Sequence, residues 1–116
     1  MVVEDNHETR DALRRILAMR GLSSVEAADG FEALDYLRNG GTAAAIVLDL
    51  RMPMMDGFAV RAELAANPTW ARIPIIVYSA AMPEVPISGV FASVHKGTDD
   101  PDVLLKAIAA CLDRSP

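Results

Sequence analysis

Residues 44–57 read AAIVLDLRMPMMDG, and no other stretch of the chain says as much about the class of fold. The segment begins with a wholly apolar run, as expected of a strand that is buried on both faces of a parallel sheet. Asp49 follows this run directly, so the acid is expected at the carboxyl edge of the sheet. Over residues 57–66, Val60 and Leu64 lie one turn apart and predict a helix. A strand, a loop and a helix in this order are typical of one βαβ unit.

Short apolar runs alternate with amphipathic segments on both sides of this stretch. Asp5 or Asn6 is expected to cap the first helix, and Asp29 to cap the second. The predicted strands are residues 1–3, 24–28, 44–48, 75–78 and 90–94. The predicted helices are residues 57–66 and 102–112, together with segments at about 6–20 and about 30–39.

This alternation predicts an α/β protein with a parallel sheet and right-handed crossovers. At this length we expect one domain, residues 1–116, with a flavodoxin-like, doubly wound, five-stranded sheet in the order 2-1-3-4-5. Pro83 and Pro86 interrupt the segment between Ser79 and Val90, where the fourth helix of such a fold would lie. The fourth helix is therefore expected to be short, distorted or absent.

The composition excludes several classes of protein. Hydrophobic residues make up 52% and charged residues 23%, a balance typical of a folded chain. The net charge of −5 argues against direct binding to nucleic acid or to an anionic membrane. The longest uncharged run, residues 73–83, is far shorter than the ~20 residues of a membrane helix. Cys111 is the only cysteine, which fits the reducing cytoplasm, where we expect the protein.

Polar residues that follow the predicted strands define a candidate site. They are Glu4 and Asp5, then Asp49, Ser79 and Lys96. Because the carboxyl ends of parallel strands meet at one edge, we expect these side chains to lie together. Clustered carboxylates repel one another unless a cation joins them, and oxygen ligands suit Mg²⁺. A carboxylate beside Mg²⁺ and a lysine is suited to act as the nucleophile in phosphoryl transfer.

At these residues the sequence resembles the receiver domain of two-component response regulators. Residues 2–6 (VVEDN) look like the first strand and acidic pair of that family. Residues 46–57 (IVLDLRMPMMDG) are similar to its phosphoacceptor segment. Residues 73–80 (IPIIVYSA) are similar to its fourth strand, which ends in a Ser/Thr-Ala switch pair. The resemblance covers nearly the whole chain.

The resemblance implies a role for each candidate residue. Asp49 would accept a phosphoryl group from a histidine kinase or a histidine phosphotransfer protein. Ser79 would move toward the phosphoryl group, and Lys96 would pair with it. The Mg²⁺ ligands would be Asp5, Asp49, the backbone carbonyl of Arg51 and, mostly through water, Glu4. By this resemblance the chain is a signalling domain rather than an enzyme.

The sequence departs from the family at three places. The family lysine is usually followed by proline, often with a cis bond, whereas Lys96 is followed by Gly97. A cis bond costs much more before glycine than before proline, so we expect a trans bond or a remodelled loop. Ser93 stands where the family has a switch aromatic, and the segment from Ser79 to Lys96 is shorter than usual. The phosphorylation site therefore matches the family, whereas the face around the fourth helix and the fifth strand differs from it.

The sequence is also compatible with other functions. The altered face could serve a phosphorylation-independent interaction module, with a second copy of the chain or a downstream protein as its partner. A phosphatase or phosphotransferase of the aspartyl-phosphate type is disfavoured, because Arg51 stands where such enzymes have a second aspartate. No glycine-rich nucleotide motif is present. His7 and His95 are interpreted as ordinary surface or strand-edge residues.

Overall fold

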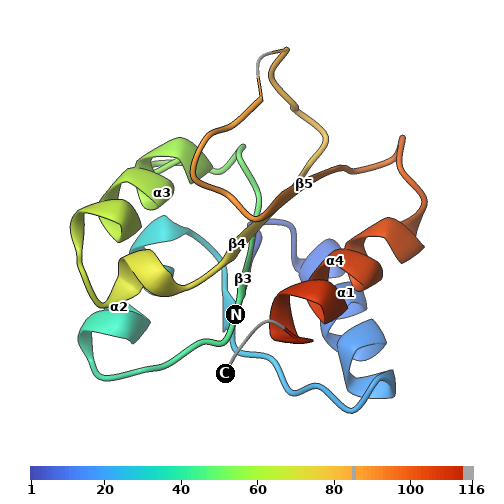
Figure 1. Ribbon diagram of the computed structural model, residues 1–116, viewed down its shortest axis with the longest axis horizontal. Coiled ribbons are helices and arrows are strands. Elements are labelled where there is room, and N and C mark those ends of the chain that lie inside the picture. The colour runs from blue at the N-terminus through green and yellow to red at the C-terminus, as the bar shows by residue number, and fades with distance from the viewer. Residues whose placement is uncertain (85, 114–116) are drawn as a thin grey trace.

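The computed structural model describes residues 1–84 and 86–113 of the chain. Strands and helices alternate along it except between the last two strands (Figure 1). The strands are β1 (Val2–Val3), β2 (Glu26–Ala27), β3 (Ile46–Leu48), β4 (Ile75–Ser79) and β5 (Ala92–His95). The helices are α1 (His7–Met19), α2 (Gly30–Arg38), α3 (Gly57–Ala66) and α4 (Pro101–Asp113), with a 3₁₀ turn, η1 (Trp70–Arg72), before β4.

The strands form one parallel sheet in the order β2-β1-β3-β4-β5, which confirms the predicted flavodoxin-like topology. β1 pairs with β2 on one side and with β3 on the other. In the second pairing Val3 lies opposite Leu48. The chain goes from β1 to β2 on one side, and the next strand, β3, lies on the other side of β1. The gap between the ends of β1 and β3 is the topological switch point of the sheet, and the residues after these two strands border it.

Helices cover both faces of the sheet, α1 and α4 on one side and α2 and α3 on the other (Figure 1). Alternate strand residues divide between these layers. Val2 and Val47 pack with α1 and α4, whereas Val3 and Leu48 pack with α2 and α3. Central strands that are buried on both faces have no place for polar side chains, which explains their wholly apolar sequences. None of the described helices is long and apolar enough to cross a membrane.

The start of α1 resolves the alternative between Asp5 and Asn6. Asn6 is the cap, and its Oδ1 accepts a hydrogen bond from the Thr9 N–H at 2.9 Å. The carboxylate of Asp5 is thus not used to cap the helix. Asp29 and Asp56 cap α2 and α3 in the same way.

The connection from β4 to β5 contains no helix in its described residues, 80–84 and 86–91. This confirms the expectation drawn from the prolines of this segment. After β5, Gly97 has a φ of +86°, which proline cannot adopt. No described peptide bond is cis. The Lys96–Gly97 bond is therefore trans, which is one of the two alternatives expected, and the loop uses a backbone conformation that is open to glycine and not to proline.

Candidate functional site

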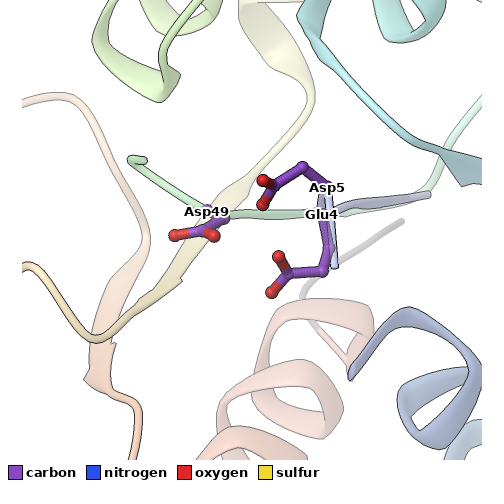
Figure 2. A group of neighbouring side chains, drawn as sticks. All are labelled: Glu4, Asp5 and Asp49. Carbon is purple, nitrogen blue, oxygen red and sulfur yellow. The ribbon is translucent and has the colours of Figure 1, made fainter. Parts of the chain in front are cut away.

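Glu4, Asp5 and Asp49 lie together at the carboxyl edge of the sheet (Figure 2). Glu4 and Asp5 follow β1, and Asp49 follows β3, its hydrogen-bonded neighbour. One carboxylate oxygen from each residue lies within 4.8 Å of the others. The fold therefore brings the predicted acids into one cluster.

Lys96 lies between the buried acids of this cluster. Its ammonium donates a hydrogen bond to Glu4 Oε1 at 2.5 Å and lies 3.8 Å from Asp49 Oδ2. Glu4 is 2% exposed, and burial raises its pKa because the charged form loses its hydration. The hydrogen bond from Lys96 opposes that rise. Asp5 is exposed, so the cluster opens to solvent on its side.

The backbone around Asp49 is held tightly. Its N–H donates to the Val3 carbonyl at 3.0 Å, and its Oδ1 accepts from the Arg51 N–H at 3.3 Å. Gly57, the first residue of α3, donates to the Leu50 carbonyl at 2.9 Å. A Cβ atom on Gly57 would lie 2.4 Å from the Asp49 carbonyl oxygen. Glycine at this position therefore lets α3 begin directly against the end of β3, and it helps to set the place of Asp49.

Ser79 ends β4 and faces a hollow beside Asp49. Its Oγ accepts a hydrogen bond from the Ala81 N–H at 3.2 Å, which leaves the hydroxyl hydrogen available for another acceptor. The hollow has a volume of about 220 Å³, large enough for a phosphoryl group. Its lining consists of Asp49, Arg51, Ser79, Ala80, Ala81 and Lys96. The sequence-predicted hydroxyl and ammonium thus reach the same hollow as the acid.

A wider hollow of about 570 Å³ adjoins this one and shares Arg51 and Ala81 with it. Asp5 lines its acidic side, and Phe58 lines its apolar side. Asp49 lines the smaller hollow and is not among the residues that line the wider one.

Two contacts at this site were missed by the sequence interpretation. The Arg10 guanidinium donates to the Glu4 carbonyl at 2.9 Å and so holds the turn that presents Glu4 and Asp5. A ring nitrogen of His95 lies 3.0 Å from the Ala80 carbonyl oxygen. An arginine on an amphipathic helix and a histidine at a strand end carry no sequence signal for such contacts.

The donor set of the cluster fits Mg²⁺. Asp5 points its carboxylate toward that of Asp49 (Figure 2), and both offer the hard oxygen ligands that this ion prefers. Glu4 is engaged with Lys96, which fits a contact with the ion through water better than a direct one. The Arg51 backbone lies next to Asp49, as its hydrogen bond to Oδ1 shows.

Comparison with known proteins gives one consistent answer. The sequence profile described as "Response regulator receiver domain" matches residues 1–109. The response regulator MprA of Mycobacterium sp. (strain KMS) is 38% identical over 100 residues, 86% of this chain and 41% of that protein. MprA of Mycobacterium avium (strain 104) is 37% identical over 100 residues, with the same coverage. The chain therefore spans about two-fifths of the length of these curated relatives.

Solved structures have the same fold. A response regulator receiver protein from Pseudomonas putida superposes with a TM-score of 0.80 at 28% identity, over 94% of this chain and 93% of that chain. The response regulator TrrA from Thermotoga maritima, solved in complex with Mg(2+)-BeF, gives a TM-score of 0.81 at 24% identity over 96% of both chains. At the lower identity the likeness concerns the fold alone.

Proposed function

The chain belongs to the family of response regulator receiver domains of two-component systems, and from this premise we propose that it is a Mg²⁺-dependent phosphoacceptor. Asp49 receives the phosphoryl group from a phosphohistidine of a histidine kinase or a histidine phosphotransfer protein. The observation that carries the proposal is the position of Asp49, with acids on one side and Lys96 and Ser79 on the other. The chain then acts as a cytoplasmic signalling domain.

In the proposed reaction an Asp49 carboxylate oxygen attacks the phosphorus in line with the bond to the histidine nitrogen. The new oxygen–phosphorus bond forms as the phosphorus–nitrogen bond breaks, and the electron pair returns to the imidazole. When bound, Mg²⁺ neutralises the negative charge that the carboxylates and the phosphoryl oxygens bring together. Asp5, Asp49 and the carbonyl of Arg51 would hold the ion, with Glu4 acting through water.

Lys96 and Ser79 supply the remaining stabilisation. Lys96 is 3.8 Å from Asp49 Oδ2, so a small movement of its flexible side chain reaches a phosphoryl oxygen in the adjoining hollow. Ser79 donates its free hydroxyl hydrogen to another phosphoryl oxygen. Both contacts form only when the phosphoryl group is present, and they give the phosphorylated state a different arrangement of the β4 and β5 ends. Hydrolysis by water resets the domain.

The proposal is tested by intact mass after incubation with phosphoramidate, with and without Mg²⁺. The wild type is expected to gain one phosphoryl group only when Mg²⁺ is present. Asp49→Asn is expected to gain none. Asp35→Asn, a matched change of an exposed acid on α2, is expected to behave as the wild type.

A wild type that gains no phosphoryl group and binds no Mg²⁺ would refute the phosphoacceptor function. The working hypothesis would then be a phosphorylation-independent interaction module. Phosphorylation of Asp49→Asn at the wild-type rate would instead place the acceptor at another residue.

A further inference from the structure

The imidazole of His95 bridges the ends of β4 and β5 beside the phosphoacceptor hollow. Its Nε2 lies 3.0 Å from the carbonyl oxygen of Ala80, the residue that follows Ser79. A carbonyl oxygen only accepts hydrogen bonds, so Nε2 carries the hydrogen. The proposed reaction assigns no role to this contact.

The backbone holds His95 firmly. Its N–H donates to Asp99 Oδ2 at 2.7 Å, and its carbonyl accepts from the Asp99 N–H at 2.9 Å. The N–H of the next residue, Lys96, donates to the Ser79 carbonyl at 2.9 Å. The histidine ring therefore extends toward Ala80 from a fixed position at the end of the sheet.

The Ala80–Ala81 peptide group is held at both of its polar atoms. His95 binds its carbonyl, and Ser79 Oγ accepts its N–H at 3.2 Å. Because a peptide group is planar, fixing the direction of the carbonyl also fixes the direction of the N–H. Ala80 is exposed, and the described residues between it and β5 form no helix that would hold its peptide group. The orientation of this peptide group thus depends on His95.

We propose that His95 is a positioning residue for phosphoryl transfer, which acts through the Ala80–Ala81 peptide group on the Ser79 hydroxyl. With the Ala81 N–H directed at Oγ, one lone pair of the hydroxyl is occupied and its hydrogen is free to point into the hollow. Without the histidine the peptide group rotates, and the hydroxyl loses its preferred direction. This inference rests on the proposed function, because it concerns the same site.

The test compares His95→Ala with His95→Gln, whose side-chain amide keeps an N–H donor of similar reach. Phosphorylation by phosphoramidate is expected to slow about twofold to tenfold in His95→Ala, the range for the loss of one neutral hydrogen bond. His95→Gln is expected to recover at least half of the wild-type rate. The Mg²⁺ affinity of both variants is expected to match that of the wild type, because no hydrogen bond or ion pair in the described part of the chain joins His95 to Glu4, Asp5 or Asp49.

The Ser79→Ala background separates positioning from a general structural effect. If His95 acts through the Ser79 hydroxyl, then His95→Ala causes no further slowing once that hydroxyl is gone. The same loss in both backgrounds would overturn the proposal. So would a wild-type rate in His95→Ala, or a failure of His95→Gln to restore it while the variant remains folded.

Hydrogen exchange of the Ala81 amide, followed by NMR without any phosphodonor, gives a second measurement. The amide is expected to exchange about threefold faster or more in His95→Ala and at close to the wild-type rate in His95→Gln. Equal exchange in all proteins would overturn the role of His95. A wild type that takes no phosphoryl group and binds no Mg²⁺ but shows this exchange pattern would refute the proposed function, while the hold of His95 on the Ala80–Ala81 peptide group would stand.

Discussion

Replacing Gly57 with alanine would place a methyl group where the backbone at the end of β3 already lies. The added Cβ would be 2.4 Å from the Asp49 carbonyl oxygen and 2.8 Å from the Leu50 Cα. Ordinary contact begins at 3.4 Å, so the start of α3 and the end of β3 must separate by about 1 Å. Neither atom belongs to a flexible side chain that could turn away.

Two opposing effects decide the change in stability. Alanine is favoured over glycine in a helix by about 0.5–1 kcal/mol. Forcing extra volume into a packed site costs about 1–3 kcal/mol. We expect the clash to win, with a loss of about 1–2 kcal/mol in the free energy of unfolding and a Tm lower by about 4–8 °C. Asp49 moves with its backbone, and a displacement of about 1 Å is enough to slow phosphorylation severely.

The matched control is Gly30→Ala. Gly30 is also the first residue of its helix and also follows an aspartate cap. A Cβ there would meet the Val60 and Met55 side chains at 2.5 and 2.9 Å, and side chains adjust more readily than backbone. Thermal unfolding and intact mass are measured for both variants. A Gly57→Ala protein as stable as Gly30→Ala, with normal phosphorylation, would refute the steric argument.

Two further predictions concern the acids. Burial raises the pKa of Glu4 in the folded state above its ordinary value of 4.5. The folded protein therefore holds this proton more tightly than the unfolded chain, so the stabilisation from protonated Glu4 is complete below pH 4.5 and is lost as the pH rises through the folded-state pKa. In Mg²⁺-free buffer, Glu4→Gln should therefore remove part of the fall in the free energy of unfolding by urea as the pH rises above 4.5, and an unchanged slope would contradict this. Mg²⁺ at about 100 times its Kd should stabilise the wild type by about 2.7 kcal/mol in thermal scans. Asp5→Asn should lose most of the stabilisation by Mg²⁺. Asn6→Ala should lower the free energy of unfolding by about 1 kcal/mol through the lost helix cap but retain the stabilisation by Mg²⁺. Stabilisation of Asp5→Asn by Mg²⁺ to the same extent as the wild type would exclude Asp5 as a ligand.

Local sequence patterns predicted which helices and strands form better than they predicted the residues at which these begin and end. The helix over residues 57–66 has the predicted bounds, because its start, cap and apolar spacing are all local features. The predicted strand over 24–28 is reduced to Glu26–Ala27, because the length of an edge strand depends on where its neighbour β1 pairs with it. A short, distorted or absent helix between β4 and β5 could be predicted because the obstacle, proline, lies in the segment itself, and the described residues 80–84 and 86–91 contain none.

Local sequence is enough to predict which residues lie at strand ends, which strands are buried and where prolines disfavour a helix. These properties depend on side-chain polarity and backbone preferences over a few residues. The pairing of Lys96 with Glu4, 92 residues away in the chain, and the contact of His95 with the carbonyl of Ala80 become visible only in the folded chain. Such contacts depend on which strands become neighbours and on the direction in which packing leaves each side chain, and no local pattern encodes either.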